Sequence, residues 1–274
     1  SAWGTMLAVG AAVGGVVAAT LGRDTAFLVD GASFLASAGL LARIRRPFGE
    51  PRAGVEHAGV VAATAETLAY ARRDHRVLAL LAVKGGFGLA AGVFVLIGVF
   101  GQEVFGRGEV GIGTLMAFRG VGALVGPFLG RALAGRDDRR LHVAIFLALA
   151  TFGAGYVLFG LAPSLALAAA AVCLAHLGGG AQWVLSTYGL QRLVPDRIRG
   201  RVFAFDFALV TLSLALSSVV AGWAADHLGP RRAAVALGAV ALAWALAWWG
   251  ATRGVRRAAA LAAREEPGLG TAGR

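Results

Sequence analysis

The sequence predicts an all-α integral membrane protein, a helical bundle with eight transmembrane helices. Of its 274 residues, 58% are hydrophobic and 15% are charged, whereas a soluble domain has about 45–50% apolar and about 25% charged residues. Its apolar segments reach the roughly 20 residues that a helix needs to cross the hydrocarbon core of a bilayer. Its basic residues gather in alternate connections between these segments.

Eight apolar segments have the required length. They are Gly4–Gly22, Thr25–Ile44, Val77–Gly101, Glu109–Ala134, Leu141–Ala162, Ser164–Arg192, Gly200–Asp226 and Ala233–Thr252.

The connections after the second, fourth, sixth and eighth segments carry 20 Lys and Arg residues, against 4 in the alternate connections. Positively charged connections stay in the cytoplasm, and an even number of spans then puts both termini there. Nearly all basic residues are Arg, a bias typical of GC-rich bacterial genomes. The expected location is therefore a bacterial cell (inner) membrane, with both termini cytoplasmic.

Other protein classes are disfavoured. The net charge of +11 lies between apolar segments rather than on a soluble surface, so no nucleic-acid partner is expected. The single cysteine, Cys173, excludes an intrachain disulfide and a cysteine metal cluster. No His/Glu pair has metal-ligand spacing and no Gly-x-x-x-x-Gly-Lys loop occurs. We therefore expect no metal, no cofactor and no enzyme.

The long connection divides the chain. Residues 1–46 hold two helices, residues 47–76 form a cytoplasmic linker, residues 77–257 hold six helices, and residues 258–274 form a cytoplasmic tail. Within the linker, Pro47–Ala58 is polar, and Val60–Arg73 has helical periodicity with one apolar side. This stretch is either an amphipathic helix at the membrane interface or a solvated linker helix.

Two glycine-rich stretches predict close helix packing. Gly10, Gly14 and Gly15 lie in the first segment, and Gly120, Gly122 and Gly126 lie before Pro127 in the fourth. Small residues four apart let a second helix backbone approach. The alternative is that such a short pattern is a generic packing face.

Two connections carry further motifs. One combines a helix-ending proline with a possible local charge pair and arginines at the headgroups; it contains Pro195, Asp196, Arg199, Gly200 and Arg201. The other has the form Gly-x-x-x-Asp-x-x-Gly-x-Arg and contains Gly222, Asp226, Gly229 and Arg231. We expect Asp226 and the nearby arginines to form a local charge-paired turn.

Together these motifs resemble the major facilitator superfamily, most closely a bacterial exporter branch that includes the enterobactin exporter. The resemblance covers nearly the whole chain and aligns it with parent helices five to twelve, as if truncated at the N-terminus. It departs from the family at Ala11, where proline is usual, and at Ala134, where aspartate is usual. Because the Gly222–Arg231 motif falls on an external connection, the family's gating role does not transfer to it.

The resemblance implies a secondary active transporter, an antiporter for proton-coupled efflux. The cargo would be a small amphipathic molecule, drug-like or siderophore-like, moved by alternating access. The partners would be the lipid bilayer, small-molecule cargo and protons. If four parent helices are absent from the native protein, this chain is expected not to transport alone. The alternatives are an inactive truncated fragment, or a non-transporting membrane scaffold or enzyme.

Placing an ionisable side chain inside a membrane-spanning segment costs about 2.5–3.5 kcal/mol on insertion scales, so each such residue is a candidate for a structural or functional role. Asp30, Lys84 and Asp206 lie within about two turns of a predicted helix end, and Arg119 lies near mid-membrane. One interpretation is a buried ion pair with an aspartate as proton carrier and Arg119 tuning it. The other is purely structural pairing. His176 and Gln182 are further candidates for contact with cargo or protons.

Overall fold

The computed structural model describes residues 20–45, 59–135 and 137–265, together with residues 6, 10, 13, 14, 17 and 18. Every regular element in these ranges is helical, and seven helices are long and apolar enough to cross a membrane. The all-α membrane fold is therefore confirmed. The first predicted segment, Gly4–Gly22, and the linker Pro47–Ala58 lie mostly or wholly outside the described residues.

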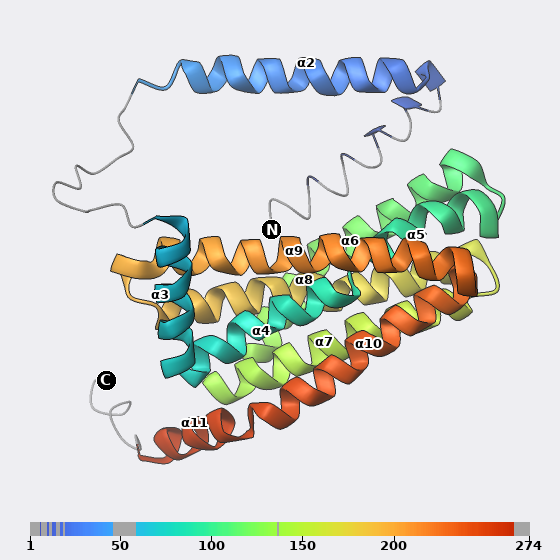
Figure 1. The fold of residues 1–274 in the computed structure, drawn as a ribbon. Helices are drawn as coiled ribbons and strands as arrows, with labels where there is room; N and C mark the ends of the chain where they lie inside the picture. The colour runs from blue at the N-terminus through green and yellow to red at the C-terminus, as the bar shows by residue number, and fades with distance from the viewer. Residues whose placement is uncertain are drawn as a thin grey trace, which may run out of the picture.

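Helices α4 to α10 run side by side as a bundle, and α3 lies across one end of it (Figure 1). No described side chain of α2 is buried. The described elements are α2 (Arg23–Ala42), α3 (Val60–Arg73), α4 (His75–Ala90), α5 (Val93–Val99), the π-helix η1 (Phe100–Val104), α6 (Gly108–Ala134), α7 (Asp138–Leu161), α8 (Leu165–Leu193), α9 (Asp196–Leu228), α10 (Pro230–Ala251) and α11 (Arg253–Glu265).

One end of the bundle carries most of the charge. It is formed by α3, the α6–α7 and α8–α9 connections and the start of α11, and we call it the basic end. The predicted linker helix is present as α3, which packs on α4 and α9. Its position at a membrane interface stays a prediction.

Glycines hold α6 directly against the backbone of α8. A Cβ added at Gly122 would lie 2.2 Å from the carbonyl oxygen of Cys173, and one at Gly126 would lie 2.2 Å from that of Leu177. From the other helix, a Cβ at Gly180 would lie 2.7 Å from the carbonyl oxygen of Ala123. The side chain of any other residue would separate the two helices at these points.

The other predicted packing glycines have different surroundings. Gly120 is buried within α6. Gly10 and Gly14 have no atom within 4 Å of an added Cβ, and Gly15 lies outside the described residues. No helix among the described residues therefore packs on Gly10 or Gly14.

The opposite side of α8 meets α7 in the same way. A Cβ at Gly178 would lie 2.2 Å from the carbonyl oxygen of Ala148, and one at Gly155 would lie 2.5 Å from the backbone nitrogen of Ala175. The glycines in the middle of α8 thus let α6 and α7 approach it from two sides.

The third predicted segment, Val77–Gly101, is not one continuous α-helix. It breaks between α4 and α5, and continues into η1. At the break the Ser217 hydroxyl of α9 donates to the carbonyl of Leu89 (2.6 Å) and accepts the N–H of Gly92 (3.0 Å). A side chain inserted into the helical hydrogen-bond ladder in this way interrupts it, and sequence periodicity does not reveal it.

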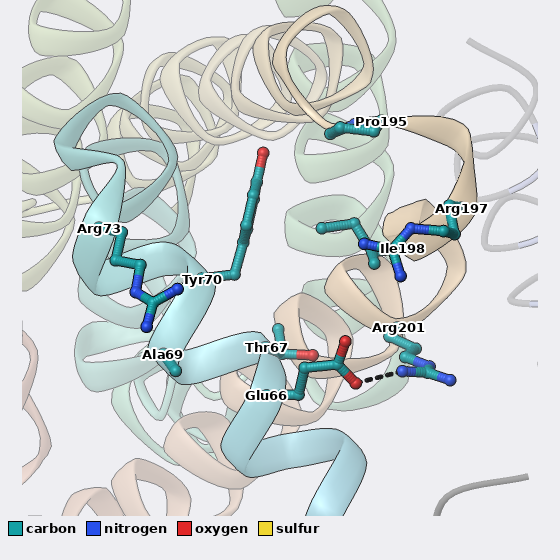
Figure 2. A pocket seen from close by; sticks show the side chains of 9 residues that line it. All are labelled: Glu66, Thr67, Ala69, Tyr70, Arg73, Pro195, Arg197, Ile198 and Arg201. Atoms are coloured by element: carbon teal, nitrogen blue, oxygen red, sulfur yellow. Dashed lines mark hydrogen bonds and ion pairs between the residues drawn. The ribbon is translucent and has the colours of Figure 1, made fainter.

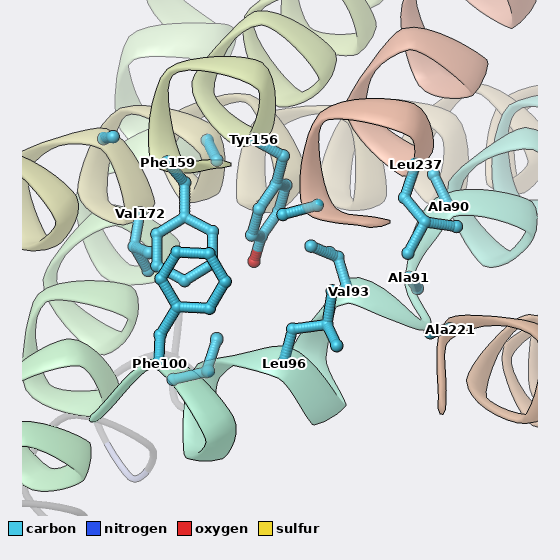
Figure 3. Packing of buried hydrophobic residues seen from close by; sticks show 14 of the residues in the cluster. Ala90, Ala91, Val93, Leu96, Phe100, Tyr156, Phe159, Val172, Ala221 and Leu237 are labelled. Atoms are coloured by element: carbon cyan, nitrogen blue, oxygen red, sulfur yellow. The ribbon is translucent and has the colours of Figure 1, made fainter. Parts of the chain in front are cut away.

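Beyond this break, α5 and η1 complete an apolar core with α7 and α8. Figure 3 shows the rings of Phe100 and Phe159 stacked face to face, with centroids 4.1 Å apart. Tyr156, Val93 and Leu96 lie around them and are at most 1% exposed.

The side chain of Asp74 fixes the start of α4 at the basic end. Asp74 caps α4 by accepting the N–H of Arg76 (2.9 Å), and the two side chains pair at 3.2 Å. Partial burial acts to raise the pKa of Asp74, but its hydrogen bonds with Arg76 outweigh burial and hold that pKa below its usual value. The cap thus stabilises the fold above the unfolded-state pKa and loses this effect as the pH falls through the lower, folded-state pKa.

Residues 258–274 were expected to be a cytoplasmic tail, and the first of them belong to the helix α11 (Arg253–Glu265). Arg256 lies over the Trp249 ring, with its guanidinium carbon 3.4 Å from the centroid. The same side chain donates to the Trp249 carbonyl (2.7 Å) and the Thr252 hydroxyl (2.6 Å). These contacts tie α11 to the end of α10.

The α6–α8 contact can be tested with Gly126→Ala. The new methyl group meets the Leu177 carbonyl, so we expect a loss of about 1–3 kcal/mol in stability and a lower unfolding temperature of the purified protein in detergent. Gly113→Ala is the matched control, because no atom lies within 4 Å of an added Cβ there. Equal unfolding temperatures for the two variants would rule out the contact.

Candidate functional site

A buried ion pair joins α4 to α9. The ammonium group of Lys84 pairs with Asp206 Oδ2, and the two residues are 4% and 1% exposed. Two full charges this deeply buried persist only when paired and hydrogen-bonded. The sequence identified both residues as candidates without indicating that they are partners.

The α8 helix completes the surroundings of Lys84. Its ammonium group donates to the Thr187 hydroxyl at 3.0 Å and lies 4.7 Å from the ring centroid of Trp183. The three ammonium hydrogens thus have an anion, a hydroxyl and an aromatic face available. Asp206 differs, because its Oδ1 has no hydrogen-bond partner among the residues described.

The pair lies deeper in the bundle than the sequence suggested. α4 begins at His75 and α9 at Asp196, earlier than the predicted segments. At 1.5 Å per residue, Lys84 and Asp206 are about 14–15 Å from those helix starts. Half of a hydrocarbon core about 30 Å thick is the same distance. The expectation that Asp206 lies within two turns of a helix end is therefore wrong, whereas Lys84 does lie within two turns of the end of α4 at Ala90.

Glycines of α4 allow the pair to form. A Cβ at Gly88 would lie 2.5 Å from the Ser213 Cβ of α9, and one at Gly86 would lie 1.9 Å from the Trp244 ring of α10. The close approach of α9 to α4 brings Asp206 within reach of Lys84, one turn earlier along α4.

Arg119 of α6 has a different environment from the one predicted. It forms no ion pair with a described carboxylate; its guanidinium carbon lies 4.2 Å from the ring centroid of Phe94, and its Nη1 is 3.8 Å from Met116 Sδ. Its Nε is buried without a hydrogen-bond partner. The buried aspartate pairs with Lys84 instead, because α9 lies against α4.

His176 joins α8 to α7. Its Nε2 is 2.8 Å from the Tyr156 hydroxyl, and both side chains are at most 3% exposed. The ring of His176 also packs on Phe94, with centroids 5.3 Å apart. Phe94 thus touches both Arg119 and His176.

A row of aromatic rings connects the ion pair to Arg119. Trp183 contacts Phe87 (5.9 Å between centroids), and Phe87 contacts Phe94 (5.8 Å). Lys84 lies at the Trp183 end of this row and Arg119 at the Phe94 end. We call these three rings the aromatic row. It places one cation at each end of three rings whose planes are tilted or edge-on to one another.

Two other candidates lie apart from this row. Gln182 is 1% exposed, and neither atom of its amide has a described partner. It is one helical turn from Gly178, on the face that meets α7. Asp30 is on the exposed helix α2, where its carbonyl accepts the Ser33 hydroxyl, and the structure does not bring it to the ion pair.

The motif between α8 and α9 forms a local network. Pro195 precedes the first turn of α9. Asp196 pairs with Arg199, whose Nε also donates to the carbonyl of Val194 (3.3 Å). Gly200 has no atom within 4 Å of an added Cβ. A fifth member of the motif, Arg201, pairs with Glu66 of α3.

The Gly222–Arg231 motif does not form the predicted charge-paired turn. Asp226 has no ion pair within the described ranges. Arg231 instead donates to the carbonyls of Gly160 (3.3 Å) and Ala162 (2.6 Å) at the end of α7. Gly229 has a φ of +85° and joins α9 to α10. Arg231 therefore binds the free carbonyls at the end of α7, and not Asp226 as the sequence predicts.

Sequence reasoning missed Tyr156 and Phe94 as parts of the site. An aromatic residue in an apolar segment carries no signal of its own. The glycine spacing of α6 predicts that another helix packs closely on it, but it does not identify that helix as α8. The described residues contain no group of three His, Cys, Asp or Glu side chains placed to hold a metal ion.

The ion pair can be tested by a double-mutant cycle. Lys84→Met leaves a buried carboxylate without a cation, and Asp206→Leu leaves a buried ammonium group, so we expect each to cost about 3–5 kcal/mol. The double variant should be more stable than either single variant, as measured by thermal unfolding in detergent. The exposed Arg192–Asp138 pair is the control, and breaking it should cost less than about 1 kcal/mol. Additive effects at Lys84 and Asp206 would refute the pairing.

Comparison with known proteins agrees with this architecture. Residues 108–271 match the family model described as Major Facilitator Superfamily. A search of curated proteins gives no match. The family consists mainly of membrane transporters that are not enzymes, and its members cross the bilayer several times. Because the matched region covers more than half of the chain, this multi-pass membrane protein belongs to the major facilitator superfamily.

Proposed function

We propose that this transporter exports a small amphipathic compound in exchange for protons, by alternating access, with Asp206 as the proton carrier. The observation that carries the proposal is the state of the Asp206 carboxylate. It is buried near the middle of the bundle, one oxygen faces Lys84, and the other oxygen has no described hydrogen-bond partner. Intramembrane carboxylates of this kind mark proton pathways.

The free oxygen gives a physical basis for exchange. A proton bound at Oδ1 makes the carboxyl neutral, while Oδ2 still accepts from Lys84. A cargo O–H or N–H group needs the same Oδ1 as an acceptor. Cargo and proton therefore exclude each other at one atom, which is the condition for antiport.

The aromatic row supports a cargo with a flat apolar surface. Stacking against the half-buried rings of Trp183 or Phe94 binds such a surface, and Asp206 fixes an edge that carries a donor. Drug-like and siderophore-like aromatic compounds both have this chemistry. Lys84 and Arg119 at the ends of the row disfavour strongly cationic cargo.

The charge distribution supports an orientation. By the positive-inside rule the basic end lies in the cytoplasm of a bacterial inner membrane, with both termini on that side. In this proposal residues 47–76 are the cytoplasmic linker between residues 1–46 and the six-helix unit 77–257.

The proposal can be tested with proteoliposomes that contain pyranine as an internal pH indicator and have an acidic lumen. Adding N-phenyl-naphthylamine, a neutral aromatic amine with an N–H donor, should release protons from the lumen, because inward movement of the amine is exchanged for protons. We expect Asp206→Asn to reduce this release at least about tenfold, since an amide at this position cannot take up the proton.

Asp226→Asn is the matched control, because it removes the same charge from an exposed position at the other end of α9. It should release protons as the unmodified protein does. No proton release by the unmodified protein would overturn the proposed exchange. Equal release by Asp206→Asn would overturn the role of Asp206.

A further inference from the structure

A separate pocket lies at the basic end, between α3 and the first turns of α9. Its volume is about 380 Å³, within the range of small-ligand sites. Figure 2 shows the two helices on opposite sides of it, with Tyr70 standing between them. The ion pair and the aromatic row contribute no residue to this pocket.

The pocket has an excess of positive charge. Arg73, Arg197 and Arg201 line it, and its one lining carboxylate, Glu66, already pairs with Arg201. Within the described ranges no acidic side chain pairs with Arg73 or Arg197. In Figure 2 these two arginines approach from opposite helices, Arg73 from α3 and Arg197 from α9. Two unpaired guanidinium groups facing one cavity match a phosphate oxyanion.

The backbone adds to this charge. The pocket lies at the N-terminus of α9, a 33-residue helix preceded by Pro195. The positive end of the helix dipole favours an anion there. The first-turn carboxylate of Asp196 does not line the pocket and is already paired with Arg199.

The pocket also has an apolar part. Ala69 and Ile198 line it beside the arginines. A free phosphate ion would leave this apolar part in contact with water, whereas the glycerol and upper acyl carbons of a lipid would cover it.

We propose that this pocket binds the phosphate headgroup of an anionic phospholipid. Arg73 and Arg197 hold the phosphate from opposite sides, the Tyr70 hydroxyl is available to donate a further hydrogen bond, and Ile198 contacts the glycerol region. Because the two arginines belong to α3 and α9, the bound lipid fastens the linker helix to the six-helix unit. This lipid site is separate from the ion pair and the aromatic row.

Native mass spectrometry of the full chain tests this directly, with phosphatidylglycerol and phosphatidylcholine added in separate titrations. We expect retention of phosphatidylglycerol in preference to phosphatidylcholine. Removing two charge-assisted contacts in the Arg73→Gln/Arg197→Gln variant should weaken phosphatidylglycerol binding at least about tenfold. Circular dichroism and the unfolding temperature without lipid establish that this variant is folded.

Arg139→Gln/Arg140→Gln is the control, because it removes two exposed charges from the basic end at α7 without touching the pocket. It should bind phosphatidylglycerol as the unmodified protein does. An equal loss in both double variants would show general attraction to basic residues and overturn the site. Displacement of the lipid by an equimolar amount of inorganic phosphate would assign the pocket to free phosphate and overturn the lipid proposal.

Discussion

The contacts of α8 with its neighbours depend on glycines, which carry no side chain to keep two helix backbones apart. Gly122 and Gly126 bring α6 against the carbonyl oxygens of α8, and Gly178 brings α8 against a carbonyl of α7. In a bilayer such packing replaces the hydrophobic effect as the force between helices. It also places His176 beside Tyr156 and sends Trp183 and Thr187 toward Lys84. The close contact between helix backbones therefore brings the side chains around Lys84 and His176 together.

Much of the fold follows from two sequence signals, apolar length and the position of the arginines. They predict the spans from α6 to α10 to within a few residues, because a bilayer imposes both length and flanking charge. They do not predict the break between α4 and α5, which Ser217 causes from another helix. They also miss α11, because a short Arg-rich amphipathic helix has the composition of a polar tail.

For the site, sequence identified the charged residues and not their partners. A charge in an apolar segment stands out by its insertion cost, so Lys84, Arg119 and Asp206 were found. Which of these charged residues pair depends on which helices are in contact. Lys84 pairs with Asp206 because Gly88 lets α9 pack closely against α4. The local network around Asp196 involves close neighbours in sequence. Arg231, in contrast, finds its acceptors on α7, some seventy positions earlier.

The break between α4 and α5 has a mechanical consequence. Lys84 stands on one side of it and Phe94, which carries Arg119 on its face, stands on the other. The junction between them is clasped by a hydroxyl of α9, the helix that also supplies Asp206. A displacement of α9 would therefore act on both pieces at once, moving the Asp206 carboxylate relative to Lys84 and turning the short helix α5. Lys84 and Arg119 are thus both linked to α9, the first through Asp206 and the second through Phe94 and the junction.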